Sequence, residues 1–109
     1  MDKNNRKKFI TPNFENDFEK IYNYIKQDSV QNADKFKAEL QKAMQEIEKH
    51  PDANPPVTNF PNITQRYRFR LFLKSFKIIY KLLKDTLIFL GIVHIAQGYS
   101  VYKNIRKNY

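Results

Sequence analysis

The spacing of the apolar residues changes once along this chain, and that change constrains the fold more than any other feature. Between residues 14 and 47 apolar side chains recur three or four positions apart, which is typical of amphipathic helices. From residue 65 to residue 95 the period is two, which is typical of strands. The chain has 109 residues and no internal repeat, so we expect a single domain, residues 1–109, that combines both parts.

Two helices are predicted before residue 51. Thr11 and Pro12 suit the N-cap and the first helical position, where the missing N–H of proline costs nothing. Asp28 and Ser29 break the first helix and can cap the second, which Pro51 ends. The short connection predicts an antiparallel hairpin whose apolar stripes need a sheet to cover. These stripes are Phe14, Phe18, Ile21 and Ile25, then Ala33, Phe36, Leu40, Met44 and Ile47.

Strands are predicted at about 65–73, 76–83 and 86–95, after a loop over residues 51–64 that holds four of the five prolines. Lys74-Ser75 and Lys84-Asp85 separate them and fit two-residue hairpin turns. Residues 7–10 precede the helices as an edge strand. The expected fold class is therefore α+β: an antiparallel β-meander of three strands plus an N-terminal edge strand, with an α-helical hairpin packed on one face.

Two-residue turns would also determine which side chains share a face of the sheet. Leu73 would then lie opposite Phe76, and one apolar face, with Leu87, Phe89, Gly91 and Val93 from the third strand, would receive the helices. The other face would carry five cations, which are Arg66, Arg68, Arg70, Lys77 and Lys81. Beside them would run an aliphatic strip with a histidine, made of Ile79, Leu83, Ile88, Leu90, Ile92 and His94. We interpret this surface as a binding face for a protein or a nucleic acid. The alternative is a strand edge that carries arginines against aggregation, with the strip covered by the C-terminal segment.

The charge distribution favours a polyanionic partner. Residues 1–52 hold ten Lys and Arg and ten Asp and Glu, whereas residues 53–109 hold ten Lys and Arg and a single acid, Asp85. All of the net charge of +9 therefore belongs to the second half. Such an asymmetry is typical of chains that bind nucleic acid or an acidic protein segment.

Several classes of function are disfavoured by composition. The chain has no cysteine, only the histidines His50 and His94, and two well-separated glycines, so we expect no metal, no cofactor and no glycine-rich phosphate loop. No apolar run approaches the ~20 residues of a membrane span, and the first residues lack the apolar core of a secretory signal. We expect a cytoplasmic protein with no small-molecule substrate and no membrane partner.

The order of these elements resembles that of the RelE/ParE superfamily of type II toxin–antitoxin toxins. Residues 17–25, Asp-Phe-Glu-Lys-Ile-Tyr-Asn-Tyr-Ile, resemble the first helix of the family, and Ala33, Phe36 and Leu40, running on to His50-Pro51, resemble the second. Arg68 and Arg70, then Tyr80 and residues 92–94, resemble its meander. The similarity extends from about residue 8 to residue 102.

This resemblance implies a growth-inhibiting toxin of a plasmid-stabilisation type, neutralised by a cognate acidic antitoxin, and it leaves the oligomeric state open. The long helices are similar to the ParE-like branch, whose members poison DNA gyrase. The alternative is a RelE-like, ribosome-dependent mRNA endoribonuclease, for which His94 and Tyr102, or less plausibly Tyr99, would be the catalytic candidates. Many members carry an arginine where Gln97 stands, so a relative that only binds the antitoxin is a third possibility.

Overall fold

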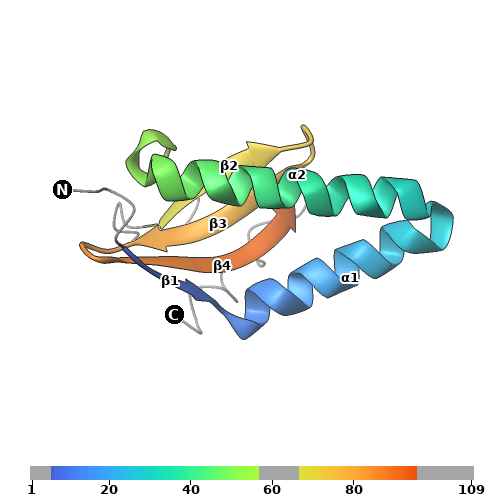
Figure 1. The fold of residues 1–109 in the computed structure, drawn as a ribbon, viewed down its shortest axis with the longest axis horizontal. Coiled ribbons are helices and arrows are strands. Elements are labelled where there is room, and N and C mark those ends of the chain that lie inside the picture. Colours follow the sequence, from blue (N-terminus) through green and yellow to red (C-terminus); the bar gives the residue numbers. More distant parts are fainter. Residues whose placement is uncertain (1–5, 57–66, 96–109) are drawn as a thin grey trace.

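The computed structural model describes residues 6–56 and 67–95, which form a sheet with two antiparallel helices on one face (Figure 1). In chain order the elements are β1 (Lys7–Ile10), α1 (Pro12–Asp28), α2 (Val30–Lys49), the 3-10 helix η1 (Pro51–Ala53), β2 (Tyr67–Phe72), β3 (Phe76–Leu82) and β4 (Thr86–His94). In the described ranges no helix is both long and apolar enough to span a bilayer.

The predicted α+β fold is confirmed. The strand order is β1-β4-β3-β2, with β2, β3 and β4 forming the antiparallel meander and β1 at one edge. β1 runs parallel to β4, so the sheet is mixed. The end of the helical hairpin where α1 meets α2 extends beyond the strands (Figure 1).

The helix boundaries follow from three predicted residues. The Oγ1 atom of Thr11 accepts a hydrogen bond from the N–H of Phe14 at 3.1 Å, and Pro12 opens α1. Ser29 serves both helices, because its N–H donates to the carbonyl of Ile25 and its Oγ accepts from the N–H of Asn32. One residue therefore ends α1 and caps α2, which makes the connection as short as the sequence indicates.

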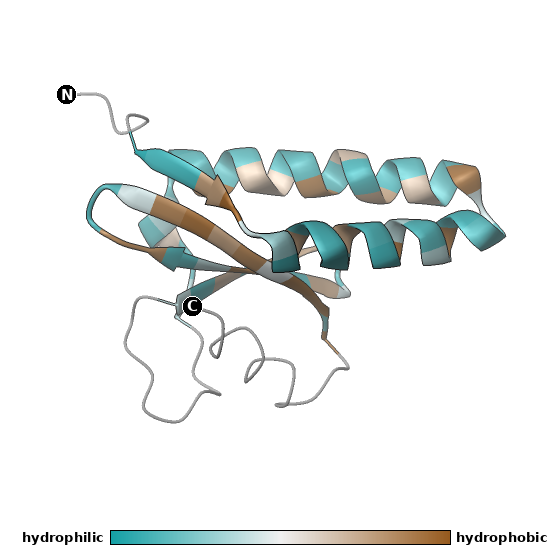
Figure 2. Cartoon of the chain, turned by 90° about the horizontal axis from the view of Figure 1, so that it is seen from below, coloured by the Kyte–Doolittle hydropathy of each residue, from teal (hydrophilic) through white to brown (hydrophobic). Residues whose placement is uncertain are grey.

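The main core lies between the helices and the sheet. Phe36 of α2 is 1% exposed and contacts Phe72 and Phe76, whose ring centroids lie 5.6 Å and 5.1 Å away. Each fully buried side chain of this size contributes roughly 1.5–3 kcal/mol to stability. Figure 2 shows the helical pair on one side of the strands, with hydrophobic residues concentrated along the middle of the meander.

The predicted register between β2 and β3 is wrong by one residue. Phe72, not Leu73, is the partner of Phe76, so the turn holds the three residues 73–75. Leu73 and Lys74 have φ angles of 51° and 61°, the left-handed region that non-glycine residues rarely adopt. Because side chains alternate along a strand, this slip moves every β2 side chain to the face opposite the predicted one.

The second predicted turn is confirmed. Leu82 pairs with Leu87, and the N–H of Leu83 donates to the carbonyl of Thr86 at 2.9 Å, which leaves residues 84–85 as a two-residue loop. The part of β4 beyond this turn departs from the prediction.

A β-bulge in β4 reverses the faces of its second half. Tyr80 pairs with Phe89 but Ile79 pairs with Gly91, so Leu90 is an extra residue on the β4 side. Ile92 therefore joins the core beneath the helices, and Val93 joins a second cluster with Ile79 and Leu90. The predicted placement of Val93 toward the helices, and of Ile92 and His94 away from them, is wrong for this reason.

Candidate functional site

The described residues do not form the predicted basic face, because Arg68 and Arg70 lie on the helix side of the sheet. The guanidinium of Arg70 on β2 forms an ion pair with Glu46 on α2. Nη1 of Arg68 donates to the main-chain carbonyl of Asn54 and more weakly to that of Asp52, at 3.4 Å. Both arginines thus connect β2 to the end of α2 and to η1. Arg66 lies outside the described residues.

The two lysines of the predicted face lie on the other side of the sheet. Nζ of Lys77 stands 4.6 Å from the ring centroid of Phe69, and Nζ of Lys81 stands 5.4 Å from that of Tyr67. Both contacts have the geometry of cation–π interactions, with the lysines on β3 and the rings on β2. The described cations are therefore split between two faces.

The aliphatic strip predicted beside the cations is not an exposed surface. Ile79 and Leu90 are fully buried and Ile92 is 3% exposed. The face away from the helices thus carries a second apolar cluster, formed by Tyr67, Ile79, Leu90 and Val93, with Phe69 and Ile88 packed against it.

His94, the first catalytic candidate, is exposed and lies at the end of β4 on the helix side. Its ring makes an edge contact with Phe76, at 5.4 Å between centroids. Lys77 and Lys81 lie on the opposite face, so the described part of the chain does not bring them to this histidine. Tyr102, Tyr99 and Gln97 lie outside the described residues.

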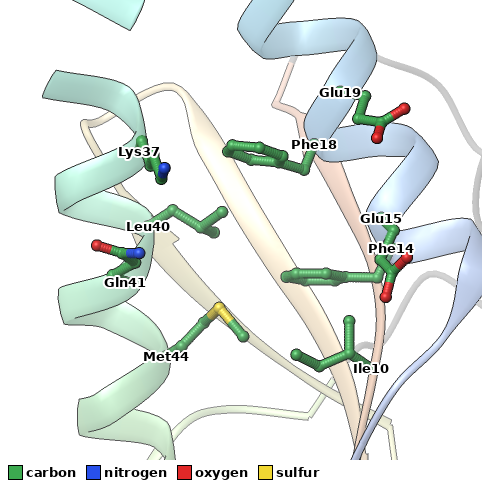
Figure 3. A pocket seen from close by; sticks show the side chains of 9 residues that line it. All are labelled: Ile10, Phe14, Glu15, Phe18, Glu19, Lys37, Leu40, Gln41 and Met44. Atoms are coloured by element: carbon green, nitrogen blue, oxygen red, sulfur yellow. The ribbon is translucent and has the colours of Figure 1, made fainter. Parts of the chain in front are cut away.

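A groove between the two helices is one of several hollows on the described residues that are large enough to receive part of a partner. Its volume is about 410 Å³. Figure 3 shows the side chains that line it. Apolar side chains line it from β1, α1 and α2, and these are Ile10, Phe14, Phe18, Leu40 and Met44. Its polar side chains are Glu15 and Glu19 on α1 and Lys37 and Gln41 on α2. An apolar floor between polar rims is suited to the apolar side of an amphipathic segment.

A second groove, of about 580 Å³, lies where α1 passes the end of the sheet. Ile21 and Ile25 of α1 and Phe76 and Ile92 of the sheet supply its apolar part. Asp17, Lys20, Tyr24 and His94 supply its polar groups. This groove brings His94, the catalytic candidate, together with the half-buried carboxylate of Asp17.

Asp17 and Asn13 of α1 cap the edge of β4 beyond the point where β1 ends. The Oδ2 atom of Asp17 accepts a hydrogen bond from the N–H of Ile92 at 3.0 Å, and Nδ2 of Asn13 donates to the carbonyl of Leu90 at 2.7 Å. Burial raises the pKa of Asp17, while the bond from Ile92 and the charge of Lys20 oppose that rise. These side chains satisfy backbone polar groups of β4 that β1 does not reach.

Sequence reasoning missed this capping role, although a signal was present. Asp17 stands three residues after Phe14 and four before Ile21, so it interrupts the apolar stripe that faces the sheet. A carboxylate in such a position requires a hydrogen-bond donor, because burial of an unpaired charge is costly. The donor is a backbone N–H, which no sequence pattern marks.

In the ranges 6–56 and 67–95 there is no cluster of three or more His, Cys, Asp or Glu side chains that could hold a metal ion. The arrangement of the described residues offers grooves and strand edges for a macromolecular partner.

Comparison with protein families and solved structures points to one kind of system. Residues 9–99 match the family described as the ParE toxin of type II toxin-antitoxin system, parDE. A similar solved structure is a chain of the chromosomal ParDE TA system from P. aeruginosa, with a TM-score of 0.66 and 13% sequence identity. The alignment covers 84% of the present chain and 98% of that chain, and it shows a shared fold. Comparison with curated proteins gave no significant match.

Proposed function

Because the chain belongs to the ParE toxin family of type II toxin–antitoxin systems, we propose that it arrests growth by acting on DNA gyrase in the cytoplasm and that a cognate acidic antitoxin neutralises it. The single observation that carries this proposal is the family match over residues 9–99, which includes both helices and the whole meander. The groove between the helices supplies a physical route to neutralisation.

Gyrase is the preferred target over messenger RNA because of how the candidate residues are distributed. Cleavage of RNA without a metal needs a proton-transfer group and cations around the same phosphate. Lys77 and Lys81 stack on rings of the face away from His94. Arg68 and Arg70 share the helix side with His94, but Arg70 is paired with Glu46 and Arg68 donates to the main-chain carbonyl of Asn54. This distribution supports a toxin that acts through protein contacts.

The antitoxin contact is best placed in the groove between the helices. Its floor is apolar, and Ile10 at one end of it is 48% exposed, although it is a large aliphatic residue. An amphipathic antitoxin segment would bury these side chains, and its acidic residues would be attracted by the net charge of +9. Ordering of the segment on docking would accompany this burial.

Induced expression tests the function directly. We expect growth to stop, and purified protein to inhibit supercoiling by gyrase while translating ribosomes leave their mRNA intact. Codon-positioned cuts in mRNA would replace the gyrase proposal with the ribonuclease alternative. Normal growth, with neither target affected, would leave antitoxin binding as the only activity.

A matched pair of variants on α2 tests the groove. Met44→Glu places a carboxylate on the apolar floor, whereas Gln41→Glu adds the same charge at the rim. We expect Met44→Glu to weaken binding of the antitoxin strongly and Gln41→Glu to change it little, since burial of a charge is far more costly than exposing one. Equal affinities of the two variants would place the antitoxin elsewhere.

A further inference from the structure

The two edges of the sheet differ sharply in how well they are closed. At the β2 edge the N–H of Phe69 donates to the carbonyl of Pro55 at 3.1 Å, and Arg68 forms a bridge with Pro56. Two consecutive prolines therefore cover that edge, and proline is a residue that discourages further strand pairing. At the β1 edge, no strand within the described ranges lies beyond β1.

β1 is also unusually accessible for a strand of a folded sheet. All four of its residues are exposed, and Phe9 and Ile10 are large apolar side chains with 55% and 48% of their surface accessible. An open strand edge with apolar side chains is a template for another strand, and natural proteins normally protect such an edge. The short length of β1 and its two lysines protect this edge against indiscriminate pairing, so a partner strand has to supply groups that match those lysines.

The direction of the free backbone groups follows from the bonds already made. The N–H of Lys7 donates to the carbonyl of Asp85 at 2.9 Å, and the N–H of Thr11 donates to that of Phe89 at 3.2 Å, both toward β4. Because backbone groups alternate along a strand, the N–H and carbonyl groups of Lys8 and Ile10 point away from the sheet. These are the groups that an added strand would bind.

The side chains define the chemistry of that strand. On the helix side of the sheet, Lys8 forms an ion pair with Glu48 at 2.9 Å and Ile10 lines the groove between the helices. By alternation, Lys7 and Phe9 lie on the other side. Each side of β1 therefore presents one lysine and one apolar residue, with the two lysines adjacent in sequence.

We propose that the antitoxin adds an extended segment to the open edge of β1, with two consecutive acidic residues opposite Lys7 and Lys8 and two consecutive apolar residues opposite Phe9 and Ile10. Cross-strand pairs of opposite charge and of apolar side chains stabilise such an addition. The inference rests on the proposed function, because the antitoxin is the partner that it assigns to this edge. Ile10 joins the edge to the groove, so the same antitoxin can occupy both.

Charge argues against a second copy of the chain at this edge. Antiparallel self-pairing of residues 7–10 places Lys7 opposite Ile10 and Lys8 opposite Phe9, so neither lysine gains an acidic neighbour. Each copy also carries a net charge of +9, which opposes association.

Two substitutions of one residue test the edge. Lys8→Ala and Lys8→Pro both remove the ion pair with Glu48, but only proline also removes the outward N–H. The partner in the titration is the cognate antitoxin, identified as the protein whose co-expression with this chain restores growth. We expect Lys8→Pro to bind about tenfold more weakly than Lys8→Ala, the size of effect that loss of one backbone hydrogen bond at an interface produces.

Hydrogen exchange on the unmodified complex keeps the test decisive if the proline variant misfolds. We expect the amides of Lys8 and Ile10 to become protected on binding. Equal affinities of the two variants, together with unprotected amides, would overturn the inference while the toxin function stands. Failure of the unmodified chain to bind that protein or to arrest growth would instead overturn the proposed function. A dimer of the free chain that Lys8→Pro abolishes would assign the edge to a second copy and also overturn the inference.

Discussion

The carboxylate of Asp17 on α1 accepts a hydrogen bond from the backbone N–H of Ile92 on β4, at 3.0 Å. This contact joins the first helix to the strand just beyond the bulge at Leu90. It places a half-buried negative charge beside the second groove. The free-energy cost of burying this charge changes with pH, because protonation neutralises it.

Replacement of Asp17 by Asn should change the pH dependence of stability. Burial raises the pKa of Asp17 above its usual 3.8, so the folded state holds this proton more tightly than the unfolded state. The contribution of the group to the free energy of unfolding is then most favourable below pH 3.8 and falls as pH rises through the folded pKa. We expect the stability of Asp17→Asn relative to the unmodified chain to increase across this interval in urea titrations.

Asp17→Ala serves as the control for the hydrogen bond itself. It removes the acceptor and leaves the N–H of Ile92 unpaired, which should cost about 1–3 kcal/mol at neutral pH. A relative stability of Asp17→Asn that does not change between pH 3 and pH 7 would contradict the assigned cause of the pKa rise.

The ion pair of Arg70 and Glu46 should contribute little to the free energy of unfolding. Reversing the charge of one partner should nevertheless be strongly destabilising, because two like charges would then face each other. Their side chains are 29% and 45% exposed, and partly exposed pairs contribute up to about 1 kcal/mol. Arg70→Glu should destabilise the chain, and the double variant Arg70→Glu/Glu46→Arg should recover most of the loss. Thermal unfolding of both variants checks this, and no recovery would mean that packing of the Arg70 stem dominates.

The hydroxyl of Tyr80 should stabilise the position of η1, directly after α2. Tyr80 is fully buried and donates to the carbonyl of Pro51, and its burial raises the pKa of the phenol. Tyr80→Phe should lower the free energy of unfolding by roughly 1–3 kcal/mol, because that buried carbonyl loses its donor. Tyr24→Phe, at a position 76% exposed, is the matched control and should have no measurable effect.

Lys74→Gly should stabilise the protein. Lys74 has a φ of 61° in the turn between β2 and β3, and a non-glycine residue in this region costs roughly 1–2 kcal/mol. Part of that gain is offset because glycine increases the entropy of the unfolded chain. We expect an increase of up to about 1 kcal/mol in chemical denaturation. Ser75→Gly in the same turn, at a residue without a positive φ, should be neutral or destabilising, and the same gain there would exclude the backbone explanation.

The helices were predictable because their signals are local. Thr11, Pro12 and Ser29 lie within a few residues of the groups that they cap, and the apolar stripes repeat at the helical period. The faces of the sheet were not predictable, since they depend on turn length. Leu73 and Lys74 carry no sign of left-handed geometry, which glycine or asparagine would have given.

The bulge at Leu90 was hidden for a related reason. Residues 87–93 are apolar on both faces apart from a glycine, so no alternation of polar and apolar residues marks where the register changes. Two errors in register, one in the turn before β3 and one in β4, thus account for the wrong placement of the described arginines and of His94. The interhelical groove depends on how the helices diverge, which spacing along the chain does not encode.

Ser29 ends one helix and begins the next, and from that junction α1 and α2 diverge toward their far ends (Figure 1). The two helices of the hairpin are therefore joined at a single residue, Ser29. A partner that moved α1 and α2 apart would strain the junction at Ser29. The ends of both helices at that junction would then fray together. Loss of the capping contacts of Ser29 would therefore weaken how firmly the two helices hold a partner, although Ser29 does not line the groove between them.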